Sequence, residues 1–208
     1  MFIVLGLILA AGINLKRPRQ RVGTPPARKQ SVGFAAFRTD SAGRFAKTPV
    51  RIALTKDWRF LQRSDNPSGG TICDAQGTPL CEAHVNITPL PKGPDQDPLA
   101  AFVAAVSRQA RSASRRTISN AGYQTVDGHR LWLQRTMIKE PMDPFFSLPK
   151  PAPADNAFRR RGPSGSLVVA EQRDDMIVEW IFLAHLDVLD SVVTQALPWV
   201  RQAVIGTR

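Results

Sequence analysis

The sequence of 208 residues has few of the features by which an enzyme is recognised. It holds two cysteines and three histidines, and it contains no G-x-S-x-G, P-loop, HExxH or GxGxxG pattern. The two cysteines are not spaced as C-x-x-C, which is the usual pairing in a structural zinc site. We therefore expect no metal, no cofactor and no catalytic residue, and an enzyme is the less favoured class of function.

The sequence also lacks a basic folded body, despite a formal net charge of +11. Residues 1–63 hold 13 Lys or Arg and two acidic residues, whereas residues 64–208 hold 15 of each kind. A nucleic-acid-binding domain usually carries its excess of positive charge on the folded surface. The charge distribution therefore argues against nucleic acid as a partner. It leaves one alternative open, a polyanion or nucleic-acid binder that uses the basic segment 16–63.

An apolar run, interrupted only by Asn14, fills residues 1–15. As a helix it is about 22 Å long, which is short for a membrane span but typical of the apolar part of a secretory signal. No basic residue precedes the run, and the positive-inside rule then favours a cytoplasmic location for the rest of the chain. Four basic residues follow the run and are placed to contact anionic headgroups: Lys16, Arg17, Arg19 and Arg21.

These features predict either a signal peptide or a membrane anchor in the form of a transmembrane helix, with membrane contact through residues 1–21. Two locations stay open, the cell membrane or periplasm on one hand and the cytoplasmic face of the membrane on the other. Residues 16–49 are rich in basic residues, proline and glycine and are predicted to be a linker. Within it, the phenylalanines Phe34, Phe37 and Phe45 indicate either an amphipathic element or a lead-in strand.

The globular domain is expected at residues 50–208. Asp97 as N-cap and Pro98 at the first helical position predict a helix with apolar residues at helical spacing. A second helix is predicted from about Asp187 to Val204, with a kink or break at Pro198. Between the helices lie strands with apolar residues on most of both faces, separated by an Asp127-Gly128 turn and by Arg173–Asp175. The fold class is therefore α+β, an antiparallel β-sheet flanked by helices.

A proline-rich insertion at residues 141–165 is too long for an ordinary connection. It carries two phenylalanines and three arginines that are candidates for contact with a partner: Phe145, Phe146, Arg159, Arg160 and Arg161. Two interpretations stay open, a disordered insertion and a loop that binds a protein partner.

The order of elements resembles a known family. The segments that carry the resemblance are T-K-D-W at residues 55–58, D-P-L-A-A-F at 97–102 and M-I-V-E-W-I-F-L-A-H at 176–185. The chain is similar over residues 50–205 to the PsbP-like αβα sandwich proteins, which include photosystem extrinsic subunits and small bacterial envelope proteins. The resemblance implies a non-enzymatic role in binding or assembly, and it carries over no functional residue. The insertion at 141–165 is not part of the family pattern, and no lipobox cysteine follows the apolar run.

Cys73 and Cys81 are the remaining residues with chemical potential. They lie across a turn, at a separation that is compatible with a hairpin disulfide if the chain is exported. In a reducing compartment they would instead be free thiols, and an enzyme that uses Cys73 or Cys81 stays an alternative. The favoured function is a membrane-associated or exported, non-catalytic binding or assembly module of the bacterial envelope, which holds an unidentified protein partner through its sheet edge or its proline-rich loop.

Overall fold

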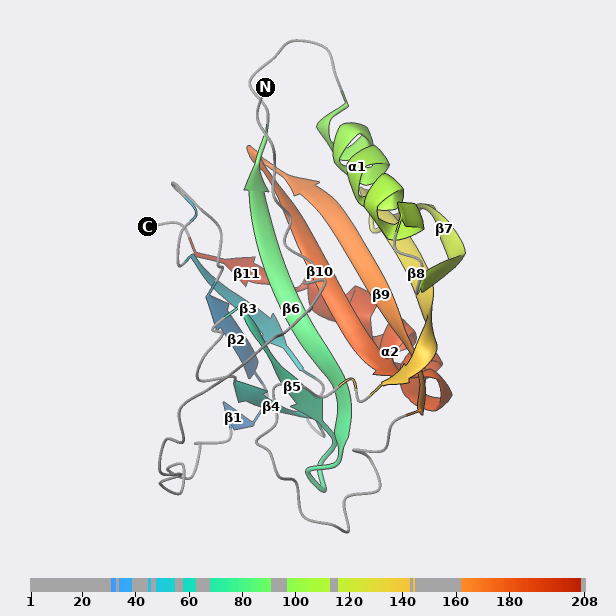
Figure 1. The fold of residues 1–208 in the computed structure, drawn as a ribbon. Coiled ribbons are helices and arrows are strands. Elements are labelled where there is room, and N and C mark those ends of the chain that lie inside the picture. Colours follow the sequence, from blue (N-terminus) through green and yellow to red (C-terminus); the bar gives the residue numbers. More distant parts are fainter. Residues whose placement is uncertain are drawn as a thin grey trace, which may run out of the picture.

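The computed structural model describes residues 31–32, 34–38, 45, 48–54, 58–62, 68–90, 97–112, 116–142, 144 and 162–206. They form an α+β fold of antiparallel sheets with two helices, as the sequence predicts (Figure 1). The apolar run at residues 1–15 and the basic residues that follow it lie outside the described residues. Neither described helix is long and apolar enough to cross a bilayer.

The larger sheet has eight strands, each antiparallel to its neighbours. In spatial order they are β1 (Ser31–Val32), β4 (Arg59–Gln62), β5 (Gly69–Cys73), β6 (Pro79–Pro89), β10 (Met176–His185), β9 (Gly162–Arg173), β8 (His129–Met142) and β7 (Arg116–Val126). Hairpin turns with a residue at positive φ, Asp127 and Asp174, join β7 to β8 and β9 to β10. Short polar residues tolerate this conformation at little cost, which explains why both turns form where the sequence predicts them.

The smaller sheet has three strands and is not predicted by the sequence. It consists of β11 (Val204–Ile205), β3 (Pro49–Ala53) and β2 (Phe34–Arg38). Strand β2 and the two-residue strand β1 both lie in the segment predicted to be a linker. The lead-in strand is therefore the interpretation that the structure supports for Phe37, whose side chain is buried. Phe45, from the same segment, is also buried in the core.

One helix lies on each face of the larger sheet (Figure 1). Helix α1 (Pro98–Ser112) begins where predicted, because the Asp97 carboxylate accepts a hydrogen bond from the Ala100 amide at 3.0 Å. Helix α2 (Leu186–Arg201) continues through Pro198 and ends three residues later, so the predicted break does not occur. Proline close to a helix end removes only one backbone bond of the last turn, which limits its cost.

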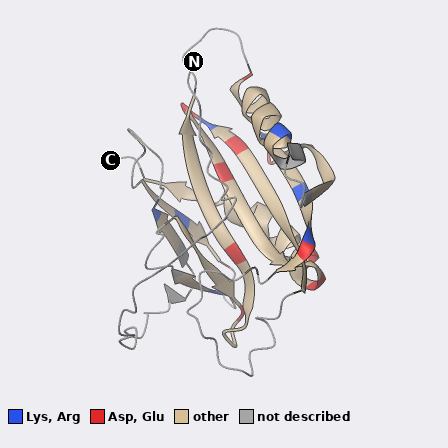
Figure 2. Cartoon of the chain, viewed as in Figure 1, with Lys and Arg blue, Asp and Glu red and all other residues tan. Residues whose placement is uncertain are grey.

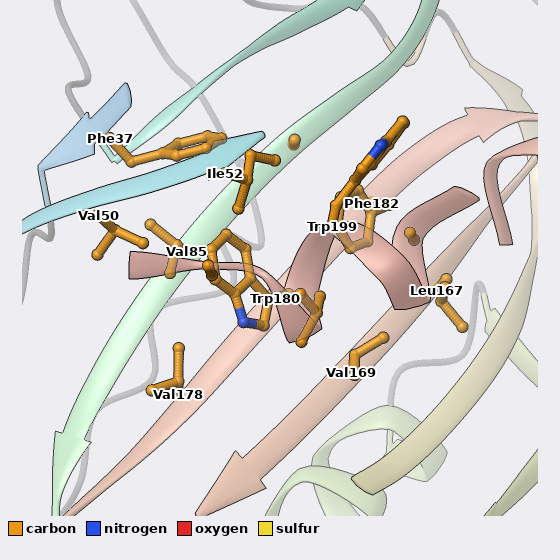
Figure 3. Close-up of a cluster of buried hydrophobic side chains, with 14 of the residues drawn as sticks. Phe37, Val50, Ile52, Val85, Leu167, Val169, Val178, Trp180, Phe182 and Trp199 are labelled. Carbon is orange, nitrogen blue, oxygen red and sulfur yellow. The ribbon is translucent and has the colours of Figure 1, made fainter. Parts of the chain in front are cut away.

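The two faces of the sheet are named here after their helices. Alternation along β10 sends Met176, Val178, Trp180 and Phe182 to the α2 face, where they join side chains from α2 and from the smaller sheet (Figure 3). The four buried residues of the α1-side cluster are Leu99, Val103, Ala170 and Ile177. The main core therefore lies on the α2 face, and the α1 face has a much smaller apolar cluster.

Candidate functional site

The α1 face carries a group of polar side chains on the central strands, called here the polar band: Thr71, Glu82, His84, Asn86 and Glu179. Register places Thr71 opposite Glu82, and Asn86 opposite Glu179. The Thr71 hydroxyl donates to Glu82 Oε2 at 2.9 Å, and Asn86 Nδ2 donates to Glu179 Oε2, also at 2.9 Å. Figure 2 shows acidic residues on β6, β9 and β10, in the middle of the sheet. The acid on β9, Glu171, lies on the other face, opposite Val178, and pairs with Arg173 of its own strand. The acids on β6 and β10, Glu82 and Glu179, have partners on neighbouring strands, so the band is a hydrogen-bonded network inside the protein.

His84 extends this network next to a glycine. Its Nε2 atom lies 3.5 Å from Glu82 Oε1, and the Glu82 side chain is fully buried. The register places Gly69 directly opposite His84, and a Cβ atom added at Gly69 would overlap the His84 ring. The glycine is therefore required for this position of the ring, because any larger residue would displace it.

Glu179 is the member of the band with a perturbed acidity. Burial disfavours its charged form and raises the pKa of the carboxyl group, and the hydrogen bond from Asn86 opposes this effect only in part. A carboxyl group with a raised pKa is a candidate for proton transfer when a cleft exposes it. Here its polar neighbour is an amide that does not titrate, so the geometry indicates a structural role. The sequence signal for the band is the alternation of polar residues along β6, PLCEAHVNITP, and the single acid in β10, MIVEWIFLAH.

The two cysteines lie on adjacent strands, and both are buried free thiols. The predicted disulfide is therefore not confirmed. The regular register of β5 and β6 places Cys81 opposite Ile72, and a β-bulge after this pair places Cys73 opposite Pro79. The register therefore explains why a pairing that looks possible from the spacing does not place the two cysteines opposite each other.

The same burial makes both thiols poor nucleophiles. Desolvation, with a smaller effect from Asp74 and Glu82, raises the pKa of Cys73 to about 12. Desolvation also raises the pKa of Cys81 well above its ordinary value. Since the thiolate is the reactive form, neither cysteine has the environment of a catalytic residue.

The most accessible feature of the larger sheet is its edge strand β7, called here the β7 edge. Strand β7 has 11 residues, whereas the strand at the other end of this sheet, β1, has two. Residues 117–126 contain no charged side chain and no proline, and most of them are exposed. Proteins usually protect a long edge strand with lysine, proline or a covering element. Within the described part of the chain, a β-bulge between Ile118 and Asn120 is the one such device on the β7 edge.

An aromatic–arginine stack lies beside this edge, formed by Tyr123, Arg130 and Trp132. The Arg130 guanidinium carbon lies 3.8 Å from the centre of the Tyr123 ring, and Tyr123 contacts Trp132 edge-on, with ring centres 4.9 Å apart. Tyr123 is 40% exposed, one of the large hydrophobic side chains that the described surface presents to solvent. Tyrosine, tryptophan and arginine are the residues most often found at the energetic centres of protein interfaces.

Ion pairs connect the hairpin of β7 and β8 to both helices. Arg130 Nη1 donates to Asp97 Oδ2 at 2.5 Å, which joins the stack to the first turn of α1. The Ala100 amide and Arg130 together lower the pKa of Asp97. On the other face, Arg201 Nε lies 3.4 Å from Asp127 Oδ2 and joins the turn to the end of α2. These contacts hold the edge strand in place without covering its outer side.

Neither the position of β7 at the edge of the sheet nor the stack of Tyr123, Arg130 and Trp132 was predicted from the sequence. A usable signal is present, since the uncharged run TISNAGYQTV precedes the hairpin turn. The candidate partner residues Phe145, Phe146, Arg159, Arg160 and Arg161 lie outside the described residues, as do Lys16, Arg17, Arg19 and Arg21. Their proposed roles stay predictions. Among the described residues, no group of His, Cys, Asp and Glu is arranged to hold a metal ion.

Comparison with known proteins gives resemblance at the level of the fold. No family model matches the chain, and no curated protein matches it. A PsbP from the cyanobacterium Synechocystis sp. PCC 6803 is similar in structure, with a TM-score of 0.43 and 11% identity over 90% of this chain and 98% of that chain. LpqN of Mycobacterium tuberculosis, which is involved in cell envelope biogenesis, has a TM-score of 0.44 and 13% identity over 84% of this chain and 91% of LpqN. The resemblance to PsbP-like proteins expected from the sequence is thus confirmed, as a weak one.

Proposed function

We propose that this chain is a non-catalytic binding and assembly module of the bacterial envelope, with a PsbP-like αβα architecture. Its apolar and basic residues 1–21 direct it to the membrane, for export or as an anchor, and its folded body docks a protein partner along the β7 edge. The observation that carries the proposal is the 11-residue edge strand of the larger sheet, mostly exposed and uncharged over residues 117–126, beside an exposed tyrosine stacked on arginine.

An exposed strand edge supports binding through its backbone. The outward N–H and C=O groups of β7 can pair with a strand of another chain, which is how several peptide-binding domains recognise their ligands. Each such hydrogen bond stabilises a complex by about 1 kcal/mol. The stack then adds the side-chain contacts that give a specific position along the strand.

The non-catalytic part of the proposal is supported by the chemistry of the interior. The two cysteines are buried, with pKa values that keep them protonated at neutral pH. The carboxylates of the polar band are hydrogen-bonded to threonine and asparagine on neighbouring strands. These contacts suit a rigid structural layer and leave the exposed edge as the surface for function.

The test is co-purification of partners from the membrane and periplasmic fractions of the native host, with the full chain as bait. We expect Tyr123→Ala to lower partner recovery about tenfold or more, as truncation of a central interface residue does. The matched control is Met137→Ala, because Met137 lies on β8 and is similarly exposed at 43%. Partner recovery that is equal for the two variants would exclude the β7 edge.

The structure corrects the bounds of the predicted insertion, since residues 141–142 belong to β8 and residues 162–165 belong to β9. A deletion of residues 145–161 leaves both strands intact and separates the edge from the proline-rich insertion. If the edge is the docking site, the deletion variant retains the partner while Tyr123→Ala loses it. The opposite pattern would place the docking site in the insertion and overturn the proposed use of the edge.

A further inference from the structure

The composition of the β7 edge indicates what kind of strand it binds. Ten consecutive residues, 117–126, carry no charge, although 22% of the residues of the chain are charged. A charged edge would select a partner of opposite charge and would repel a copy of itself. An uncharged edge does not repel the same edge of a second copy of the chain.

We infer that the partner at this edge is a second copy of the chain, whose β7 strand pairs antiparallel with the first about a twofold axis near Gly122. This inference rests on the proposed use of the edge and names its occupant. The pairing joins two eight-stranded sheets into one continuous sheet. It also removes the long unprotected edge from both chains at once.

The register of a twofold pairing supports this assignment. An antiparallel pairing about Gly122 places residues 118–126 of one copy against the same uncharged residues of the other, so that no like charges face each other. Twofold homodimers are also the commonest symmetric assemblies of soluble proteins.

The middle of β7 accepts a side chain on the face of the sheet, which makes Gly122 a usable test position. A Cβ atom added at Gly122 meets no atom within 4 Å, and it would point out of the sheet plane, away from the backbone groups that pair with a second strand. The hairpin that carries the strand is held on one side by the Arg130–Asp97 pair and on the other by the Arg201–Asp127 pair. The edge is therefore presented in a fixed conformation, and pairing requires little ordering of the backbone.

The experiment uses charge reversal at the position of the axis. Gly122→Lys and Gly122→Glu each place two like charges close together in the dimer, whereas a mixture of the two variants places opposite charges there. We expect sedimentation velocity of the full chain, in one detergent throughout, to show a dimer for the wild type, a monomer for each variant alone and a dimer for their mixture. A shift of at least tenfold in the dissociation constant is expected for each single variant.

The control variant is Ala105→Lys, which adds the same charge at an exposed position of α1 and should leave the dimer intact. If a Gly122 variant fails to fold, judged by circular dichroism, cross-linking replaces it. Gly122→Cys, a smaller substitution at the same position, is then expected to give a disulfide-linked dimer under mild oxidation, and Ala105→Cys is not. Neither native thiol interferes, because both are buried.

Two results would overturn the inference. One is a wild-type chain that stays monomeric up to about 100 µM, the upper end of affinities useful for a symmetric dimer. The other is a dimer that the Gly122 variants leave unchanged, as self-association of residues 1–15 would produce. Neither result overturns the proposed use of the β7 edge, which is tested separately by partner recovery with the Tyr123→Ala variant; the edge would then bind a strand of a different protein.

Discussion

The two faces of the larger sheet are built from the same strands but differ in chemistry. The α2 face carries Trp180, Phe182 and Trp199 in a continuous core shared with the smaller sheet. The α1 face has four buried residues in its apolar cluster, next to a band of carboxylates, amide, hydroxyl and imidazole groups. Because alternate residues of a strand point to opposite faces, one β-strand such as β10 supplies both environments. The comparison indicates that stability resides mainly on the α2 face.

The largest expected effect tests this difference directly. Trp180→Ala removes a fully buried indole from the α2 face and is expected to lower the free energy of unfolding by about 3–5 kcal/mol. Leu99→Ala removes a buried side chain from the α1-side cluster, and its expected cost is about 2–3 kcal/mol. Urea unfolding of both variants measures the difference. Equal losses, or a larger loss for Leu99→Ala, would contradict the assignment of the main core.

The second prediction concerns a buried charge on the otherwise apolar α2 face. Arg173 Nη2 lies 2.7 Å from Glu171 Oε1, and its guanidinium donates to the carbonyl oxygens of Val200 and Ala203 at the end of α2. Arg173→Ala is expected to cost about 3 kcal/mol, because Glu171 is then buried without its counter-charge.

A matched control is Arg135→Ala, which removes a surface pair with Asp190 at 2.6 Å, where Asp190 is 78% exposed. This loss is expected to be below about 1 kcal/mol. Unfolding curves with 1 M salt sharpen the comparison, since salt screens the surface pair and not the buried one. Similar losses for the two arginine variants would show that Arg173 does not hold α2 to the sheet.

The third prediction compares two glycines. Gly69→Ala introduces a methyl group that overlaps the His84 ring, and the expected destabilisation is about 1–3 kcal/mol, the usual cost of overpacking. Gly122→Ala adds a methyl group where no atom lies within 4 Å, so it should be neutral or slightly stabilising. Thermal unfolding reports both changes. A neutral Gly69→Ala variant would mean that His84 is free to move away from the strand.

Much of the fold can be predicted from local signals. The Asp97-Pro98 start of α1 and the Asp127-Gly128 turn are short-range features whose chemistry acts on neighbouring residues, and both form as expected. The smaller sheet was not predictable in this way, because β2, β3 and β11 come from distant parts of the chain. Two of these three strands have five residues and the third has two, so no strong periodicity marks them.

The candidate site was less predictable than the fold. The β-bulge at Ile72 and Cys73 depends on how two strands align, and the spacing of the cysteines does not reveal it. The stack of Tyr123, Arg130 and Trp132 requires knowledge that β7 and β8 pair with Tyr123 opposite Trp132. Register is a property of the folded sheet, and both the missing disulfide pairing and the stack follow from it.

The smallest expected effect is the change in stability on replacing Glu179 in the polar band of the α1 face. Since burial raises the pKa of Glu179, the folded state favours the protonated form. The protonated Glu179 carboxyl group therefore contributes its full stabilisation below the pKa that this group has in the unfolded chain. The contribution is lost as the pH rises through the higher pKa that the group has in the folded state. Glu179→Gln keeps an acceptor for the Asn86 amide but carries no charge. At pH 7 the variant should be more stable than the wild type by about 1 kcal/mol or less, with a smaller difference at pH 4. Urea unfolding across this range measures both, and a gain that is larger at pH 4 than at pH 7 would show that the charged form of Glu179 is the one that stabilises the sheet.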